Sequence, residues 1–248
     1  MTAAIGIDIG GTGIKGARLR VATGALLSER IKYPTPPGGH PGDVLECVRH
    51  MLDDLESSSD ELVGVCFPAV VRHGVTMSAA NVSPDWIGLP AERLFADSLD
   101  REVHFVNDAD AAGFAESRLG AARNVAGLVI VVTLGTGIGT ALISDGVLVP
   151  NAELGHLELD GADAEHRASN AAREREGLSF EEWGQRLTRY FGHLEMLFSP
   201  DLFVIGGGVS TQHAEFFHHI SVSTPIKPAE LFNNAGIVGS ALLATLNH

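Results

Sequence analysis

Residues 5–16 read IGIDIGGTGIKG, a short run rich in isoleucine that enters a glycine turn at Gly10–Gly13 and then resumes as a second run. Residues 129–141 read VIVVTLGTGIGTA and follow the same plan. The shared pattern Gly-Thr-Gly-Ile-x-x-Ala starts at Gly11 and again at Gly135, half a chain length later. A strand, glycine turn and strand at matched positions predict two related α/β domains that face each other across a cleft.

The hydrophobic patterning of the remaining chain agrees with alternating strands and helices. In the first half it predicts strands at 5–9, 14–20, 26–32, 62–67 and 103–106, a short hairpin within 69–77, and helices at 43–55, 90–99 and 108–119. In the second half it predicts strands at 128–134, 139–143 and 202–205, and helices at 162–175, at 179–197, after residues 206–208, and at 235–246. Hairpins that open each half favour α/β domains over a barrel.

Composition excludes several classes of protein. The chain has 248 residues, 45% of them hydrophobic, and its 31 acidic and 17 basic residues give a formal charge of −14. Such a charge repels nucleic acid and anionic membranes, so neither is expected as a partner. Cys47 and Cys66 are too few for a disulfide framework or a structural zinc site. With no signal peptide and no long apolar run, we expect a cytoplasmic protein.

Three glycine-rich strand ends predict a site for a chain of phosphates. They lie at Gly10–Gly13, Gly135–Gly137 and Gly206–Gly208, and the first two carry a threonine. Backbone N–H groups without side chains in the way form anion-binding hollows, although glycine also serves in turns for its geometry alone. Neither a P-loop nor a dinucleotide-binding glycine motif is present. The predicted donor-binding residues are Gly10, Gly11, Thr12, Gly13, Lys15, Thr133, Gly135, Thr136, Gly137, Gly207 and Gly208.

Asp8 follows the first predicted strand, directly beside the first glycine turn. A carboxylate there repels phosphate unless a cation lies between them, so we expect Asp8 to hold Mg²⁺ through water. The alternative is an aspartate that only caps the turn. Lys15 either neutralises phosphate charge or faces solvent.

Polar groups in two further segments suit a sugar. In one, a strand ending at Asn107 leads into a helix that begins with Asp108 and Asp110; we expect one carboxylate to cap the helix and the other to stay free. In the other, Glu153, His156 and Glu165 cluster after a loop, in a spacing that fits no standard zinc site. Carboxylates and imidazoles are suitable partners for sugar hydroxyls, and together with a phosphate site they imply a sugar kinase.

These segments resemble the ROK family of sugar kinases, and within it the polyphosphate glucokinase branch. The resemblance rests on residues 6–16, 78–81, 107–113, 133–139, 150–157 and 234–239. It implies an actin-like, ribonuclease-H-like fold of two α/β domains. The implied N-terminal domain covers residues 1–120 and is joined by a C-terminal helix at 235–248, and the implied C-terminal domain covers 121–234.

The resemblance also implies roles for individual residues. Asp108 matches the general base that takes the proton from the sugar 6-hydroxyl, with glucose as the sugar. Asp8 and the two Gly-Thr-Gly turns match the Mg²⁺ and phosphate sites, with polyphosphate or ATP as donor. Zinc is not expected, because the family's cysteine-rich motif is absent. The resemblance also implies a homodimer. The implied sugar-binding positions are Asn81, Asn107, Asp108, Glu153, His156 and Glu165.

One departure concerns the donor. The polyphosphate branch commonly has Lys or Arg after Gly-Gly-Gly-Val-Ser, where this chain has Thr211–His213. A polyphosphate track needs cations, and five arginines are candidates: Arg18, Arg118, Arg123, Arg167 and Arg173. The alternatives are an ATP-dependent ROK hexokinase, a non-catalytic sugar-sensing regulator, and an actin-like nucleotide-binding module. The regulator is disfavoured, because the first predicted strand starts at Ile5 and leaves no room for a DNA-binding domain.

Overall fold

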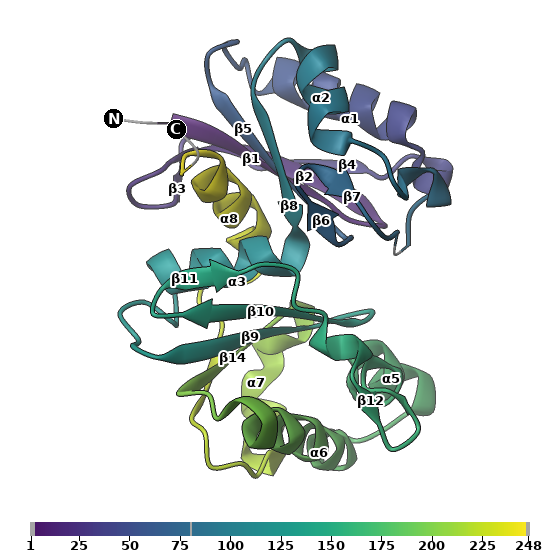
Figure 1. Ribbon diagram of the computed structural model, residues 1–248, viewed down its shortest axis with the longest axis vertical. Helices are drawn as coiled ribbons and strands as arrows, with labels where there is room; N and C mark the ends of the chain where they lie inside the picture. Colours follow the sequence, from purple (N-terminus) through teal and green to yellow (C-terminus); the bar gives the residue numbers. More distant parts are fainter. Residues whose placement is uncertain (1–2, 80, 247–248) are drawn as a thin grey trace. The chain divides into compact units, whose positions relative to one another are not determined.

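The computed structural model describes residues 3–79 and 81–246. Residues 1, 2, 80, 247 and 248 therefore lie outside the description. They are the first two residues of the predicted N-terminal domain, the last two residues of the predicted C-terminal helix, and one position of the 78–81 motif. The chain forms two compact units (Figure 1). Unit 1 comprises Met1–Ala115 and Asn234–His248, and unit 2 comprises Glu116–Asn233.

Unit 1 is built on a mixed sheet whose strand order is β3-β2-β1-β5-β8, with β4 also paired to β2. The β1–β2 pair is antiparallel, whereas β1, β5 and β8 run parallel. A separate hairpin of two short strands, β6 and β7, follows β5. The strands are β1 (Ala3–Ile9), β2 (Gly13–Arg20), β3 (Ala25–Leu26), β4 (Ile31–Pro34), β5 (Leu62–Phe67), β6 (Val71–Arg72), β7 (Val75–Thr76) and β8 (Val103–Asn107).

Helices cover both faces of this sheet. Helices α1 (Pro41–Asp54) and α2 (Ala91–Leu99) share one hydrophobic cluster with the isoleucines of β1. The opposite face of β1 packs on α8 (Ala235–Ala244), which reads AGIVGSALLA and is buried almost all round, as expected of a uniformly apolar helix. Figure 1 shows α8 alongside the sheet of the same unit.

Two glycines let α8 lie directly on the strands. A Cβ atom added to Gly6 of β1 would come within 1.8 Å of the Ile237 carbonyl oxygen. One added to Gly64 of β5 would come within 1.9 Å of the Ser240 carbonyl oxygen. The helix backbone therefore contacts the strand backbone at both positions, and only glycine fits there.

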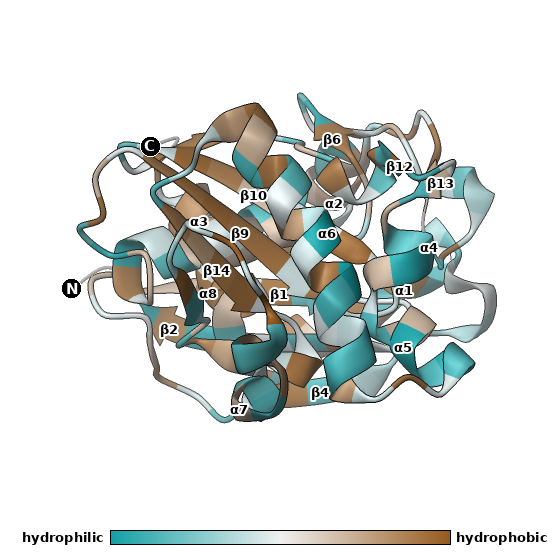
Figure 2. Cartoon of the chain, turned by 90° about the horizontal axis from the view of Figure 1, so that it is seen from below, coloured by the Kyte–Doolittle hydropathy of each residue, from teal (hydrophilic) through white to brown (hydrophobic). Residues whose placement is uncertain are grey.

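Unit 2 repeats the plan of unit 1. Its sheet has the order β11-β10-β9-β14-β15, in which β9–β10 is an antiparallel hairpin and β9–β14 is parallel. Figure 2 shows β9 and β14 as hydrophobic, as expected of central strands covered on both faces. Both halves of the sequence repeat thus form a strand, a glycine turn and a strand. The strands are β9 (Leu128–Leu134), β10 (Ile138–Ser144), β11 (Val147–Val149), β12 (Glu158–Leu159), β13 (Ala162–Asp163), β14 (Leu202–Gly206) and β15 (Ile226–Pro228).

The remaining helices lie mostly in unit 2, and α3 begins in unit 1 and ends in unit 2. They are α3 (Asp108–Leu119), α4 (Glu165–Ala168), α5 (Asn170–Glu176), α6 (Phe180–Phe198) and α7 (His213–Phe216). Short 3₁₀ turns occur at Pro37–Gly39, Pro84–Trp86, Leu154–His156, Gly208–Gln212, Phe217–His219 and Phe232–Asn234. The helix expected after residues 206–208 is therefore a 3₁₀ turn followed by one short α-helix.

Two predicted elements were wrong. The strand expected at 26–32 is interrupted, because the Arg18 backbone N–H donates to the Ser28 hydroxyl at 3.0 Å instead of to a backbone carbonyl. The helix expected at 162–175 starts later and is broken at Ser169. That residue has extended dihedral angles, and its side chain accepts from the Ala172 N–H to begin α5.

A buried carboxylate joins two distant segments of unit 2. Glu116, at the end of α3, is 1% exposed. Its side chain accepts backbone N–H bonds from Ala121 at 2.8 Å, from Leu231 at 2.8 Å and from Glu230 at 3.2 Å. The end of α3 and the segment that leads to α8 are therefore both tied to Glu116.

We predict that Glu116→Ala lowers the free energy of unfolding by about 3 kcal/mol, because it leaves three backbone N–H groups without their acceptor. Glu116→Gln keeps one carbonyl oxygen and should lose less. Urea unfolding followed by circular dichroism measures both, with the exposed Glu181→Ala as control. Equal stability of Glu116→Ala and the control would contradict this account.

Candidate functional site

The glycine turn between β1 and β2 is closed by backbone and side-chain hydrogen bonds. The Gly10 N–H donates to the Gly13 carbonyl at 3.0 Å, and the Thr35 hydroxyl donates to the Gly10 carbonyl at 2.5 Å. Gly11 and Thr12 are exposed at its tip. A Cβ on Gly11 would lie 2.9 Å from the Asn81 Cβ, so the turn and Asn81 are in close contact. The predicted phosphate-binding turn and the predicted sugar-binding residue Asn81 therefore lie side by side, although they are far apart in the sequence.

Asp8 is half-buried at the end of β1 and has two partners. Its Oδ2 forms an ion pair with Lys15 Nζ at 3.0 Å, and its Oδ1 accepts from the Cys66 thiol at 3.7 Å. Lys15 therefore points to Asp8 and not simply to solvent. Burial, followed by the charges of Asp8 and Asp108, raises the pKa of Cys66 well above its ordinary value, so this thiol remains protonated and able to donate.

Asn107 caps α3, where the sequence had suggested an aspartate. The Asn107 Oδ1 accepts from the Asp110 N–H at 3.0 Å, and its Nδ2 donates to the Ala69 carbonyl at 3.0 Å. Asn107 and Asp110 are buried at 7% and 1% exposure, whereas Asp108 is half-exposed. The expectation that an aspartate caps the helix was therefore wrong, because the Asn107 amide is the cap. Asp108 is the carboxylate that reaches the surface.

The second glycine turn, in unit 2, is closed in the same way and lies against Glu165. The Gly135 N–H donates to the Gly137 carbonyl at 3.0 Å. The Glu165 Oε2 accepts from the Ile138 N–H at 3.1 Å, and a Cβ on Gly137 would lie 2.4 Å from that oxygen. Glu165 and the turn are therefore in direct contact.

The third glycine-rich strand end lies beside the second turn. Gly207 has a φ of +84°, and a Cβ there would lie 2.4 Å from the Leu134 carbonyl oxygen. Thr133 pairs with Gly206 across β9 and β14. Gly208 is exposed and begins the following 3₁₀ turn. The predicted donor-binding residues of unit 2 are therefore gathered at one end of its sheet.

His156 lies among three carboxylates. Its Nδ1 is 3.0 Å from Asp163 Oδ2 and 3.9 Å from Glu165 Oε1, and its Nε2 is 3.9 Å from Glu153 Oε2. The hydrogen bond with Asp163, and after it the charges of Glu165 and Glu153, raises the pKa of His156 against the opposing effect of burial. Burial raises the pKa of Glu153, and the charge of His156 partly offsets this increase. The three predicted sugar-binding residues of unit 2 therefore form one cluster.

Side chains from α5 and α6 hold the short helix α4, which carries Glu165. The Trp183 indole donates to the Ala168 carbonyl at 2.9 Å, Arg186 donates to the Arg167 carbonyl at 3.2 Å, and Arg175 donates to the His166 carbonyl at 2.8 Å. Four residues are too few for a helix that is stable alone. The position of Glu165 therefore depends on these contacts.

Sequence reasoning missed Cys66 and Asp163. Asp163 could have been found from the Asp160-Gly161 pair, a strong signal for a tight hairpin. Asp160 and Gly161 both have positive φ. The hairpin that they form places Asp163 opposite Glu158 and within reach of His156. The thiol of Cys66 gave no comparable signal, because its contact with Asp8 arises from the pairing of β5 with β1.

The raised pKa of His156 predicts a specific effect of Asp163→Asn. Loss of the carboxylate should lower the His156 pKa, since Asp163 stabilises the protonated ring. The pair's contribution to stability is present below the ordinary histidine pKa and disappears as pH rises through the raised value. An NMR titration measures this, with His156→Gln to assign the resonance and Asp97→Asn as control. An unchanged His156 pKa would contradict the prediction.

Within residues 3–79 and 81–246, no group of three or more His, Cys, Asp or Glu side chains is arranged to hold a metal ion. The metal-ligand alternative for Glu153, His156 and Glu165 therefore receives no support. A Mg²⁺ ion needs less, because it keeps several waters and is bound through one or two carboxylates together with substrate phosphates. Asp8, half-buried beside an exposed glycine turn, fits that requirement. No helix in the same ranges is long and apolar enough to cross a bilayer.

Comparison with known proteins identifies relatives over nearly the whole chain. The family model described as "ROK family" matches residues 4–177. A polyphosphate glucokinase from Mycobacterium tuberculosis is 42% identical over 96% of this chain and 89% of its own. The inorganic polyphosphate/ATP-glucomannokinase from Arthrobacter sp. strain KM is 51% identical, with a TM-score of 0.95 and full coverage of both chains.

A more distant structure supports the fold alone. The ROK family glucokinase from Streptomyces griseus, solved with glucose and AMPPNP, is 24% identical, with a TM-score of 0.83 over 98% of this chain and 99% of its own. The predicted actin-like fold of two α/β domains is thereby confirmed.

Proposed function

Because this chain belongs to the ROK family, we propose that it transfers a phosphoryl group from inorganic polyphosphate, or from ATP, to the 6-hydroxyl of glucose. The observation that carries the proposal is the half-exposed carboxylate of Asp108, between a buried helix cap and a buried Asp110. A kinase of this type needs one accessible carboxylate beside the acceptor hydroxyl and a cradle for the donor phosphates.

Asp108 would act as the general base. It lies in the first turn of α3, where the N–H groups of the helix N-terminus point toward a negative charge. The Ala109 N–H donates to its Oδ1 at 2.8 Å, which orients the carboxylate. The carboxylate takes the proton of the 6-hydroxyl as the oxygen attacks phosphorus, and the phosphoryl bond to the donor breaks.

Each unit, taken by itself, offers polar groups suited to the remaining hydroxyls of glucose. Unit 1 supplies Asn81 and the Asn107 amide, which keeps one N–H hydrogen and one oxygen lone pair beyond its two intramolecular bonds. Unit 2 supplies Glu153, His156 and Glu165. With its raised pKa, His156 donates to hydroxyl oxygens while the carboxylates accept from hydroxyl groups.

Each unit also carries glycine turns suited to donor phosphates. Gly10–Gly13 and Thr12 in unit 1, and Gly135–Gly137 with Thr136 and Gly207–Gly208 in unit 2, offer backbone N–H and hydroxyl donors. Lys15 adds a positive charge beside Asp8. Mg²⁺ bound at Asp8 through water would neutralise charge on the transferred phosphate.

Donor assays test this proposal. Purified protein, glucose and Mg²⁺ are combined with either long-chain polyphosphate or ATP at equal phosphate concentration, and glucose 6-phosphate is measured. We expect turnover with polyphosphate; turnover with ATP alone would establish the ATP-dependent hexokinase instead. Absence of turnover with both, together with retained glucose binding, would favour the sugar-sensing regulator. A homodimer and a cytoplasmic location remain predictions, the first measurable by light scattering.

A further inference from the structure

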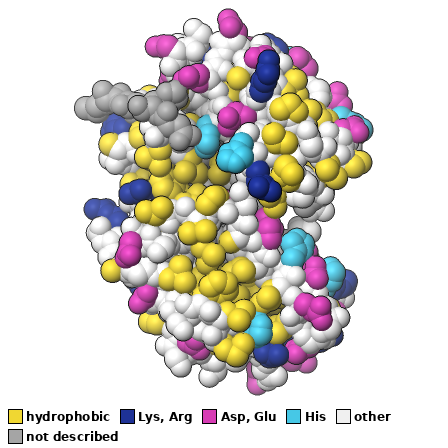
Figure 3. Space-filling view, viewed as in Figure 1, with side chains coloured by type: hydrophobic (Ala, Val, Ile, Leu, Met, Phe, Trp, Pro, Cys, Tyr) yellow, Lys and Arg dark blue, Asp and Glu magenta, His cyan; other side chains and the backbone are white. Residues whose placement is uncertain are grey.

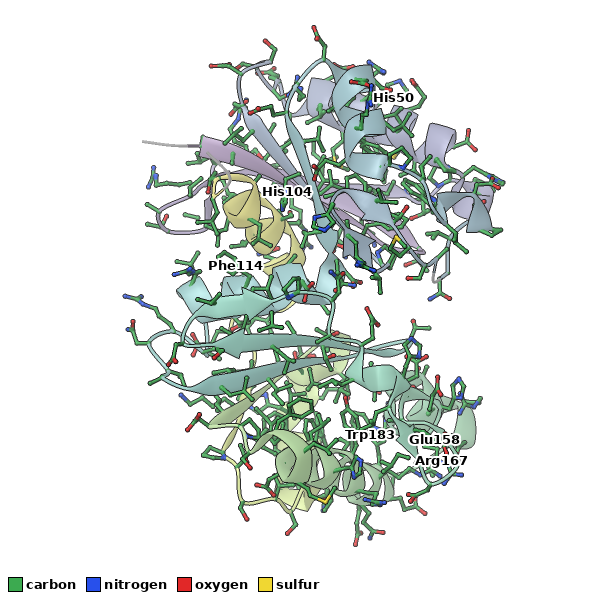
Figure 4. All side chains as sticks on the ribbon, viewed as in Figure 1. His50, His104, Phe114, Glu158, Arg167 and Trp183 are labelled. Atoms are coloured by element: carbon green, nitrogen blue, oxygen red, sulfur yellow. The ribbon has the colours of Figure 1, made fainter. Side chains whose placement is uncertain are left out.

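A pocket of about 370 Å³ lies in unit 2, next to α4 but outside the cluster around His156. It is formed by the β12–β13 hairpin, α4, the end of α5 and α6. Its apolar lining consists of Leu159, Ala164 and Ala168. Its charged lining consists of Arg167, Arg186, Arg189, Asp160 and Glu176. Figure 4 labels Arg167 in this part of the unit, together with Trp183.

Three guanidinium groups therefore meet two carboxylates. Arg186 pairs with Glu176 at 2.7 Å, and Arg189 pairs with Asp160 at 3.0 Å. Arg167 is exposed and has no ion pair within the described part of the chain. The pocket thus has an excess of positive charge in a protein whose formal charge is −14. Acidic side chains are scattered over the face drawn in Figure 3, so such an excess is a local feature.

We propose that this pocket binds phosphate groups, either those of a polyphosphate chain beyond the reacting end or those of a small phosphate ester. Arginine suits this role, because its planar fork of N–H donors matches phosphate oxygens in a bidentate geometry. The ion pairs of Arg186 and Arg189 hold their guanidinium groups in place before a ligand arrives, which reduces the ordering cost of binding. The polyphosphate form of this proposal rests on the proposed function.

A ligand in this pocket acts directly on the helix that carries Glu165. Arg167 belongs to α4, and Arg186 donates to its carbonyl. An anion that draws Arg167 or Arg186 toward itself therefore changes the support of α4, two residues from Glu165. We expect phosphate binding in the pocket to alter the affinity for glucose.

The test uses a double variant that combines Arg167→Gln with Arg189→Gln. The control is Arg93→Gln, which removes an exposed arginine from unit 1. Isothermal titration calorimetry measures the binding of orthophosphate, glucose 6-phosphate and long-chain polyphosphate to each folded protein. Steady-state kinetics then compares KM for long-chain polyphosphate with KM for tripolyphosphate. Circular dichroism confirms folding, and Arg167→Lys keeps the charge but not the bidentate fork.

A rise of tenfold or more in KM for the long chain, with KM for tripolyphosphate unchanged, would assign the pocket to the distal chain. Weaker binding of glucose 6-phosphate or orthophosphate, with both KM values unchanged, would assign it to a small phosphate ligand. Wild-type binding of all three compounds by the double variant would overturn the proposal. Because calorimetry needs no turnover, that result differs from a failure of the proposed kinase activity.

A second inference comes from a different observation, the hydroxyl of Tyr190 in α6. Tyr190 is fully buried, and its hydroxyl has no hydrogen-bond partner within the described residues. The other tyrosine of the chain, Tyr33, donates to Asp54. Buried tyrosine hydroxyls usually find a partner, so an unpaired one needs an explanation.

Tyr190 shares a hydrophobic cluster with two residues close to Glu165 in the chain. They are Ala164, which directly precedes Glu165, and Ala168, at the end of α4. Burial, and after it the charge of Glu165, raises the pKa of Tyr190, so the hydroxyl stays protonated and able to donate.

We infer that the Tyr190 hydroxyl donates to the Glu165 carboxylate through a buried water and so acts as a positioning residue for sugar binding. A water there has two polar partners from these side chains, which meets the lower requirement for a buried site. The inference rests on the proposed role of Glu165 in binding glucose.

Tyr190→Phe tests this inference, with Tyr33→Phe as the matched control. We expect KM for glucose to rise about fivefold with kcat nearly unchanged, as for the loss of one hydrogen bond. If the hydroxyl only fills space, Tyr190→Phe will raise the melting temperature and leave KM for glucose unchanged. That result would overturn the inference, whereas absence of glucose binding by the wild type would count against the proposed function.

Discussion

Asp108→Asn is expected to reduce turnover by roughly 10²- to 10⁴-fold, the contribution of a general base, while glucose binding largely survives. The amide keeps the shape of the side chain and one hydrogen-bond acceptor, so contacts to the sugar persist. It cannot accept the proton of the 6-hydroxyl, and no neighbour takes over, because Asp110 is 1% exposed. The measurement is kcat with the preferred donor, alongside the glucose dissociation constant from calorimetry.

The matched control is Asp43→Asn. Asp43 is also an acidic residue in the first turn of a helix, α1, but it is exposed and belongs to no predicted site. Its replacement should leave kcat and glucose binding unchanged. Near-normal turnover of Asp108→Asn would remove Asp108 from the role of general base.

Gly64→Ala is expected to cost about 3 kcal/mol or more and to leave little folded protein, an effect typical of strong overpacking. The added methyl group would lie 1.9 Å from the Ser240 carbonyl oxygen and 2.8 Å from the Ala241 nitrogen. Both are backbone atoms of α8, so the helix would have to leave the sheet. Thermal and urea unfolding measure the loss.

The control for this substitution should have the opposite sign. Gly192 lies inside α6, and a Cβ there would meet nothing within 4 Å. Gly192→Ala should therefore stabilise the protein by up to about 1 kcal/mol, the difference in helix propensity. If Gly64→Ala proved as stable as Gly192→Ala, the tight packing of α8 on β5 would be wrong.

Local periodicity was enough to predict most of the fold. The runs around both glycine turns are strands because their β-branched residues alternate between two covered faces. Because the pattern repeats, the second unit could be predicted from the first. Where prediction failed, one polar side chain had replaced a backbone partner. Ser28 interrupts the pairing of β2, and Ser169 starts a new helix. Hydrophobic patterns carry no information about such bonds.

The candidate site was predictable as a set of residues but not as a set of contacts. Carboxylates and glycines at strand ends stand out in a sequence, since strand ends of α/β sheets are where ligands bind. The partners that orient them come from elsewhere: Cys66 reaches Asp8 from β5, and Trp183 supports α4 from α6. Those contacts depend on which strands and helices are neighbours, a property of the whole fold.

The place of α8 in unit 1 also sets an order of events during synthesis. The strands of unit 1 leave the ribosome first, but the helix that covers one face of them is made only after the whole of unit 2, residues 116–233. At about 5–20 residues per second, the sheet waits roughly 10 s for its covering helix. Throughout that interval the glycine-lined face of β1 and β5 is open to other chains or to a chaperone. Unit 2, continuous in sequence, has no such delay and is expected to finish folding first.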